Sequence, residues 1–282
     1  MREIDCKLIT ENIKKLCIEA NYHLPDDVEN RICKCIEEEP YELAKDTLIN
    51  IKDNFEISKE EVFPICQDTG MCCVFIEIGQ DVHIIGGSIK DAINEGVRQG
   101  YEEGYLRKSV VNDAVFSRIN TKDNTPAIIN YEIVPGDKLK ITVAPKGFGS
   151  ENMCKLKMLK PSDGVEGIKE FVLDTVEQAG PNACPPIVIG VGIGGNFEKV
   201  ALLSKKAMLR KIGTRNKDER YAELEKELLE EVNKLGIGPA GYGGKTTALG
   251  LNIENSPTHI AGMPVAVSIC CHVARHKEVV LW

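Results

Sequence analysis

Short apolar segments alternate with amphipathic segments from residue 61 to the end of the chain, and glycine and proline separate them. Cys73–Ile78 and Pro264–Ile269 have the length and β-branched content of strands. Ser88–Leu106 and Val165–Gln178 repeat their apolar residues with the period of a helix. Because strands and helices are mixed along the whole region, we predict a mixed α/β (α/β or α+β) fold.

Further elements follow from the same patterns. Residues 126–134 and 138–144 are predicted to form a hairpin through the turn Pro135-Gly136-Asp137. A buried strand is predicted at residues 186–191, and helices are predicted at 197–211 and 217–235.

The first 60 residues lack this alternation and are predicted to be helical. Helices are expected around residues 8–17, at Asp26–Glu38 and after Pro40, because apolar residues recur there at helical spacing. We therefore predict two parts that pack as one unit. Residues 1–60 would form a helical N-terminal scaffold, and residues 61–282 an α/β catalytic domain.

Charge and hydropathy exclude several classes of partner. The chain has 43 acidic and 35 basic residues, a net charge of −8 that would repel a nucleic-acid backbone. No apolar run approaches the ~18–20 residues that span a bilayer, and the N-terminus has no apolar signal core. We expect a cytoplasmic protein without nucleic-acid or membrane partners. A small anionic substrate would need a local cationic pocket.

Eleven cysteines are unusual for such a chain, and their odd number argues against a disulfide framework. The close pairs Cys33/Cys35, Cys72/Cys73 and Cys270/Cys271 lack the C-x-x-C spacing of zinc or thioredoxin-like sites. Most of the eleven are therefore interpreted as buried small hydrophobic residues.

Two glycine-rich segments are similar to nucleotide-binding motifs, but each fails at a required position. Gly190–Gly195 matches G-x-G-x-x-G, yet the acidic residue expected about 20 residues later is missing from the segment 213–218. Gly241–Thr246 is out of register for a P-loop, because Pro239 stands where the leading glycine belongs. We interpret both as loops whose backbone amides approach an anion other than a nucleotide.

Three cysteines have a distinctive local setting. Cys66 lies in the segment Phe63–Gly70, Cys184 lies between Ala183 and two prolines, and Cys271 precedes His272 at a predicted strand end. In such places a rigid backbone can expose a thiolate. They lie far apart in the sequence, so only the fold could bring them together. From spacing alone, three unrelated cysteines are the simpler interpretation.

Six segments extend this pattern along the chain: Cys66–Gly70, Ala144–Asn152, Gly180–Pro186, Gly192–Gly195, Gly236–Thr247 and Pro257–Val267. In these segments and their order, the chain resembles the α subunit of class I (iron–sulfur) fumarate hydratases and the related L-tartrate dehydratases. The resemblance covers nearly the whole chain.

The resemblance implies a [4Fe-4S] cluster held by Cys66, Cys184 and Cys271, with Cys270 as the alternative to Cys271. Four cysteines would close every iron, whereas three leave one iron open as a Lewis acid for a substrate. It also implies catalytic roles for Gln67, Asp68, Arg107 and His259, and substrate binding by Gly149, Ser150, Asn152 and Lys245. Arg107 would clamp a carboxylate. For Arg107 the alternative is a solvated arginine at a helix end, and for His259 it is a histidine with a structural role. Phe148 stands where the family often has glycine.

The resemblance further implies a β subunit that completes the active site, because the chain stops soon after its third cluster cysteine. We therefore expect the α subunit of an α/β hetero-oligomer that reversibly hydrates fumarate to L-malate and has little activity alone. Within the class, dehydration of L-tartrate to oxaloacetate is the alternative. Outside it, an iron–sulfur electron-transfer or sensor protein and a cluster-free binding module are the alternatives.

Overall fold

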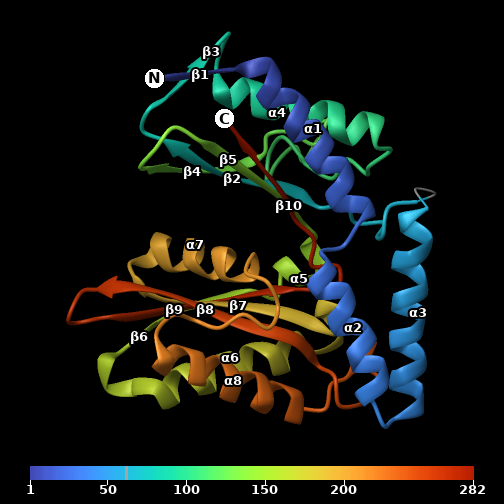
Figure 1. The fold of residues 1–282 in the computed structure, drawn as a ribbon. Helices are drawn as coiled ribbons and strands as arrows, with labels where there is room; N and C mark the ends of the chain where they lie inside the picture. Colours follow the sequence, from blue (N-terminus) through green and yellow to red (C-terminus); the bar gives the residue numbers. More distant parts are fainter. Residues whose placement is uncertain (61–62) are drawn as a thin grey trace. The chain divides into compact units, whose positions relative to one another are not determined.

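A computed structural model describes residues 1–60 and 63–282, which form two compact units (Figure 1). Unit 1 comprises Met1–Pro25, Phe55–Phe148 and Arg275–Trp282, and unit 2 comprises Asp26–Asn54 and Gly149–Ala274. Both units contain helices and strands, so the predicted mixed α/β class is confirmed. The predicted domain boundary falls at residues 61 and 62, which lie outside the described residues, and it stays a prediction.

Unit 1 is built on a four-stranded sheet in the order β10-β5-β2-β4, and β1 and β3 form a separate parallel pair. Its elements are β1 (Arg2–Asp5), α1 (Cys6–Tyr22), β2 (Met71–Gly79), β3 (Val82–Ile85), α4 (Ile89–Glu103), β4 (Ile128–Val134), β5 (Leu139–Lys146) and β10 (Lys277–Leu281). Helices α1 and α4 lie together on one face of the four-stranded sheet (Figure 1). The buried residues of β2 alternate along the strand, which gives the sheet the apolar face that these helices cover.

Glycines let α1 and α4 approach closely. A Cβ at Gly96 would lie 2.6 Å from the Cβ of Ile13, and one at Gly100 would lie 2.8 Å from the Cβ of Cys17. Each would push the two helices apart, because a close-packed interior has no room for an added methyl group. The core of unit 1 therefore forms directly between these helices and the sheet.

The predicted hairpin of residues 126–134 and 138–144 is wrong in its pairing. Strands β4 and β5 form there, but β2 lies between them, parallel to β4 and antiparallel to β5. The connecting turn crosses the end of β2 at Gly79, where a Cβ would lie 2.5 Å from the carbonyl oxygen of Gly136. The local turn signal was correct, but it could not reveal that a third strand is inserted between the two.

Unit 2 has a second four-stranded sheet, in the order β6-β9-β7-β8. Its elements are α2 (Asp26–Glu38), most of α3 (Glu42–Lys59), α5 (Phe148–Glu151, which begins in unit 1), β6 (Lys155–Leu159), α6 (Gly164–Ala179), β7 (Ile187–Gly195), α7 (Phe197–Met208), α8 (Glu219–Lys234), β8 (Ala248–Thr258) and β9 (Met263–Cys270). Helix α7 covers one face of the sheet, and α6 and α8 cover the other (Figure 1). With both faces covered, β7 and β9 are buried almost throughout.

The G-x-G segment of β7 serves helix packing. A Cβ at Gly190 would lie 2.1 Å from the carbonyl oxygen of Ser204, and one at Gly192 would lie 2.2 Å from that of Val200. These glycines let α7 pack against the strand. The N-terminus of α7 is capped within the chain, because the side chain of Asn196 accepts a hydrogen bond from the Lys199 N–H at 3.0 Å.

The sheet of unit 2 has two distinct ends. Strands β7 and β8 are parallel, and β9 is antiparallel to β7, with Cys270 opposite Val188. The starts of β7 and β8 and the end of β9 therefore share one end, which we call the cysteine end. The β8–β9 hairpin and Gly195 lie at the other. Ligands of parallel sheets usually bind at the carboxyl ends of the strands, whereas the predicted cysteines of this unit lie at the amino ends of the parallel strands β7 and β8.

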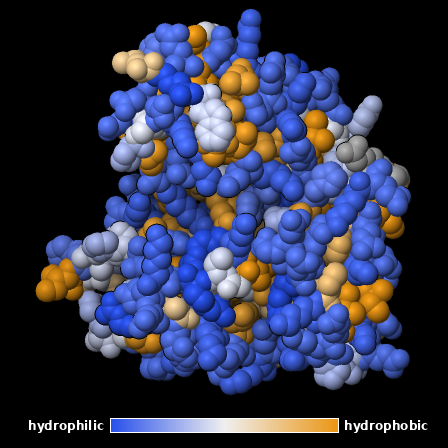
Figure 2. Space-filling model, in the orientation of Figure 1, coloured by the Kyte–Doolittle hydropathy of each residue, from blue (hydrophilic) through white to orange (hydrophobic). Residues whose placement is uncertain are grey.

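Hydrophilic side chains cover most of the surface that Figure 2 shows for each unit. Within the described ranges, none of the helices combines the length and the apolar character that crossing a bilayer requires.

Candidate active site

In unit 1, the segment Cys66–Gly70 leads into β2 and is fixed by hydrogen bonds to its backbone. The buried hydroxyl of Tyr101 lies 2.8 Å from the carbonyl oxygen of Thr69, and the side-chain amide of Asn124 donates to Gly70 at 3.1 Å. The hydroxyl of Thr69 donates to the carbonyl oxygen of Arg107 at 2.9 Å. These bonds attach the predicted substrate arginine to the segment that carries Cys66.

Asp68 uses both carboxylate oxygens to position the backbone. Oδ1 accepts the N–H of Gly70 at 3.0 Å, and Oδ2 accepts the N–H of Phe148 at 2.8 Å. The N–H of Asp68 itself points to the Sγ of Cys66 at 3.4 Å. Asp68 therefore fixes the shape of the Cys66 loop and ties it to the end of β5. Its predicted catalytic role stays a prediction.

Gln67 and Arg107 are exposed on the same part of unit 1. The Oε1 of Gln67 lies 3.4 Å from the Sγ of Cys66. Unit 1 thus brings together four of the predicted site residues, because Gln67 and Asp68 follow Cys66 directly and Thr69 bonds to Arg107.

In unit 2, Cys184 and Cys271 meet through His272. Cys184 has a left-handed backbone (φ 52°), and its carbonyl oxygen lies 3.4 Å from the N of His272 and 3.1 Å from its Nδ1. This turn exposes the Cys184 side chain at the cysteine end of the sheet. Since His272 follows Cys271 directly, the structure brings two of the three predicted ligands to one place.

Cys270, which directly precedes Cys271, has a different environment. Cys270 is only 8% exposed, and its Sγ lies 3.9 Å from the carbonyl oxygen of Val273. Cys271 is partly exposed. Cys270 therefore ends β9 with its side chain turned inward, whereas Cys271 follows the strand and is partly exposed, which favours Cys271 as the ligand.

The predicted substrate-binding residues Gly149, Ser150 and Asn152 lie at the same end of unit 2. Cys154, which follows them, accepts the N–H of Ile269 at its Sγ at 3.2 Å, and this bond ties the segment to the end of β9. Ser150 is buried, whereas Gly149 and Asn152 are exposed. Nearby, Glu151 forms an ion pair with Lys205 of α7.

The glycine-rich loop before β8 is held by an internal carboxylate. Glu39 is 4% exposed, and its oxygens accept the backbone N–H of Lys245 at 3.0 Å and of Thr246 at 3.1 Å. A Cβ at Gly244 would lie 2.6 Å from the Cβ of Ala44, so only glycine lets the loop approach this closely. The anion that these two amides bind is therefore part of the chain, which explains the likeness to a P-loop without a nucleotide.

The same loop contacts the segment that carries Cys184. The N–H of Ala240 donates to the carbonyl oxygen of Pro185 at 2.8 Å, and Gly241 packs against Pro181. Lys245 is exposed at the cysteine end. Glu39, the loop and the Cys184 segment thus form one continuous set of contacts within unit 2.

His259 lies at the opposite end of the same sheet. It follows β8 directly, and Thr258 pairs with Gly195 at the far end of β7. The nine residues of β7 separate it from Cys184, which at about 3.3 Å per residue is roughly 30 Å. The structure therefore does not bring His259 to Cys184 and Cys271 within unit 2. Figure 2 shows apolar atoms at the tip of this hairpin, where Ile260 is 91% exposed.

The family model described as fumarate hydratase (Fumerase) matches residues 10–280. The chain belongs to the fumarate hydratase (Fumerase) family. The match includes the Cys66 loop of unit 1 and the whole of unit 2, so the family model extends over both units.

Curated relatives within the Fumerase family cover nearly the same length. A putative L(+)-tartrate dehydratase subunit alpha of Methanocaldococcus jannaschii is 45% identical over 271 residues, 95% of each chain. The L(+)-tartrate dehydratase subunit alpha of Escherichia coli strain UTI89 is 33% identical over 95% of this chain and 88% of that protein. The protein of the same name from Shigella boydii is 32% identical over the same shares.

The predicted cluster ligands of this Fumerase-family chain are divided between its units. Cys66 belongs to unit 1, and Cys184 and Cys271 belong to unit 2. Across residues 1–60 and 63–282, no group of three or more His, Cys, Asp or Glu side chains is arranged to hold a metal ion. The donor set itself fits an iron–sulfur cluster, because thiolates are its usual ligands and each predicted cysteine lies on a hydrogen-bonded loop or strand end. The three-cysteine site stays a prediction.

Two residues of this region were missed by the sequence analysis. Glu39 ends a charged helix and looks like one more solvated carboxylate, and only its burial shows its contacts with a loop some 200 residues away. Arg275 follows the last predicted ligand and is 5% exposed, with its Nη2 on the carbonyl oxygen of Asp68 at 2.5 Å. No local sequence signal distinguishes either residue.

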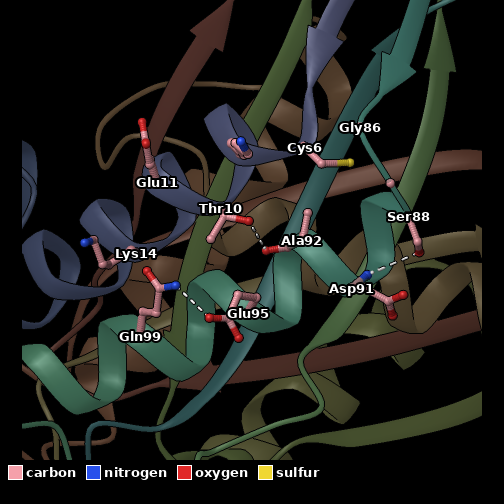
Figure 3. A pocket seen from close by; sticks show the side chains of 12 residues that line it. Cys6, Thr10, Glu11, Lys14, Gly86, Ser88, Asp91, Ala92, Glu95 and Gln99 are labelled. Atoms are coloured by element: carbon pink, nitrogen blue, oxygen red, sulfur yellow. Dashed lines mark hydrogen bonds between the residues drawn. The ribbon is translucent and has the colours of Figure 1, made fainter.

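A surface pocket of about 650 Å³ lies elsewhere in unit 1, between the first turns of α1 and α4 (Figure 3). None of the predicted site residues lines it. One of its acidic groups is engaged within the chain. Arg98 and, to a lesser extent, Gln99 hydrogen-bond to Glu95 and hold the pKa of that carboxyl low, at about 2.

Proposed function

We propose that this chain is the cluster-binding α subunit of a two-subunit iron–sulfur hydro-lyase. The observation that supports this proposal most is the Fumerase-family match over residues 10–280. It is combined with the contact between Cys184 and His272, which directly follows Cys271, at one end of unit 2. Membership of this family supports a hydro-lyase activity. The names of the relatives support the role of an α subunit.

We infer that Cys66, Cys184 and Cys271 hold a [4Fe-4S] cluster with one open iron. When bound, such a cluster supplies a Lewis acid for the substrate hydroxyl and carboxylate. The chain's own residues have supporting tasks. Asp68 holds the Cys66 loop, and the exposed guanidinium of Arg107 offers a planar fork to a carboxylate.

On the side of unit 2, the predicted substrate contacts come from two segments at the cysteine end. The segment Gly149–Asn152 offers backbone amides and a hydroxyl, and Lys245 offers a positive charge on a loop that Glu39 fixes. Fixed donors of this kind stabilise the negative charge that develops when a proton is removed next to a carboxylate. Preorganisation by Asp68 and Glu39 is the contribution that the chain makes before any substrate binds.

The substrate is a four-carbon dicarboxylic acid in this proposal. Hydration of fumarate to L-malate is the reaction that the family model's description supports. Dehydration of L-tartrate to oxaloacetate is the second candidate, because several relatives are named L(+)-tartrate dehydratase subunit alpha. Steady-state kinetics of the assembled enzyme with both acids decides between them. The preferred reaction should show the higher kcat/KM by at least about tenfold, since one hydroxyl distinguishes L-malate from L-tartrate in the pocket.

A β-type subunit is expected to provide the catalytic base and further carboxylate binders. We expect the purified chain to bind the cluster anaerobically but to show little activity until that subunit is added. Assays of the chain with and without the subunit test this. Full activity of the chain alone would contradict the two-subunit proposal, and a folded chain that takes up no iron or sulfide would contradict the cluster.

A further inference from the structure

Arg275 carries a buried positive charge that has no counter-ion among the residues that the structure describes. It is 5% exposed, and its Nη2 donates to the carbonyl oxygen of Asp68 at 2.5 Å. Its Nε and Nη1 are buried and find no hydrogen-bond partner among residues 1–60 and 63–282. The described part of the chain also places no carboxylate within ion-pair distance of it. Two nitrogen atoms of an always-charged guanidinium therefore donate no hydrogen bond to the described residues.

This arrangement is unfavourable unless a ligand completes it. A buried charge that lacks both a counter-ion and hydrogen-bond partners destabilises a folded protein strongly. Arg210 in unit 2 illustrates the usual solution, because its Nη1 contacts the buried carboxylate of Glu225 at 2.8 Å and Glu254 at 3.4 Å. Within residues 1–60 and 63–282 Arg275 has no such acid, so an anionic ligand would complete its contacts.

The position of Arg275 indicates which anion. Its guanidinium binds the carbonyl of Asp68, and the N–H of Asp68 points to the Sγ of Cys66 at 3.4 Å. Arg275 itself lies four residues after Cys271. It therefore contacts the loop of one predicted cluster ligand and follows another along the chain.

We propose that Arg275 binds the anionic iron–sulfur cluster, with its Nε and Nη1 donating hydrogen bonds to sulfur atoms at the Cys66 loop. This rests on the cluster of the proposed function. Hydrogen bonds to cluster sulfurs and a nearby positive charge stabilise the more negative, reduced state, and they also help to retain the metal. Arg275 would thus set the reduction potential and the iron retention of the cluster, and it is unavailable to the substrate.

The substitution Arg275→Met tests this on the full chain, because it keeps the volume of the side chain and removes the charge. With an anaerobically reconstituted cluster, we expect iron loss to a chelator to be about 10-fold to 100-fold faster than in the wild type. The midpoint potential of the cluster should fall. In the chain without a cluster, the melting temperature should rise, because an uncompensated buried charge has been removed.

Arg210→Met is the matched control, since it removes a partly buried arginine that does have a buried acidic partner. It should lower the melting temperature with and without the cluster, because it leaves Glu225 buried without its cation, and it should leave the potential unchanged. If Arg275→Met also lowers the melting temperature of the cluster-free chain and leaves the potential unchanged, Arg275 is structural and the proposal is wrong.

Two further outcomes would overturn the proposal for other reasons. If Arg275→Met weakens dicarboxylate binding in the assembled enzyme while iron retention and potential stay normal, the guanidinium binds substrate instead. If the folded wild-type chain takes up no iron and sulfide, the proposed function itself fails. Measuring cluster content in the wild type first separates this last case from the others.

Discussion

Glu39 joins two segments that are about 200 residues apart in the sequence. Its carboxylate accepts the backbone N–H groups of Lys245 and Thr246, and it also lies 3.3 Å from the N of Tyr41. A carboxylate can accept all of these bonds, because it has two oxygens and no hydrogen to donate. The conformation of the loop that carries Lys245 therefore depends on one buried side chain.

We predict that Glu39→Gln destabilises the chain by about 1–3 kcal/mol, because an amide replaces one acceptor oxygen with a donor that faces backbone N–H groups. Urea unfolding of the full chain measures the change. Glu42→Gln is the control, since Glu42 is exposed on α3 and should have almost no effect. Equal stabilities of the two variants would show that Glu39 does not hold the loop.

At the scale of single residues, the sequence indicates candidate ligands better than it indicates the residues that hold their loops in place. Cys184 was identified from its matched segment and Cys271 from its place directly before His272, and the structure brings His272 into contact with Cys184. Asp68 was predicted as catalytic, but both of its oxygens are engaged with backbone N–H groups. Residues such as Glu39 and Arg275 act through burial and long-range contacts, and neither property has a local pattern.

Among the elements, α7 and β7 pack through glycines that sequence analysis had related to an anion site. We predict that Gly192→Ala destabilises the chain by at least about 3 kcal/mol, because the new Cβ would lie 2.2 Å from a backbone oxygen and the helix must move. Thermal or urea unfolding measures this. Gly262→Ala, where nothing lies within 4 Å of the added Cβ, should change stability little. Similar losses in both variants would contradict the packing role.

The helices and strands themselves were largely predictable from the sequence, whereas the order in which the strands pair in each sheet was not. Helices at Asp26–Glu38 and after Pro40 and strands near residues 73–78 and 264–269 are confirmed, because local periodicity reports which face is buried. The pairing of β4 and β5 with β2 was missed, because strand order depends on contacts between distant segments. The same limit applies to His259, whose matched segment says nothing about which end of the sheet it occupies.

The position of His259 gives a prediction for assembled complexes. If His259→Ala lowers activity, the histidine acts at a site other than the one beside Cys184 of its own unit, because the length of β7 separates them. Complexes that mix His259→Ala chains with Cys184→Ala chains should then regain activity. In such a complex, the intact His259 of one chain can act at a site that contains the intact Cys184 of another chain. Folded but inactive mixtures, with each parent variant also inactive, would contradict this placement.

At the scale of the whole molecule, the predicted ligands come from two compact units. Unit 1 contributes Cys66, and unit 2 contributes Cys184 and Cys271. Metal binding by residues that are distant in the sequence is coupled to folding, so uptake of the cluster should stabilise the folded chain. The sequence alone could suggest the three ligands only through resemblance, because no local spacing relates them.

The central claim is most directly tested by the iron and sulfide content of the full chain after anaerobic reconstitution. We predict about four irons and four sulfides in the wild type and in Cys270→Ala, whose inward-facing thiol should not be a ligand. Cys66→Ala, Cys184→Ala and Cys271→Ala should each lose most of the cluster while remaining folded. Full cluster content in any of these three variants, or its loss in Cys270→Ala, would contradict the proposed ligand set.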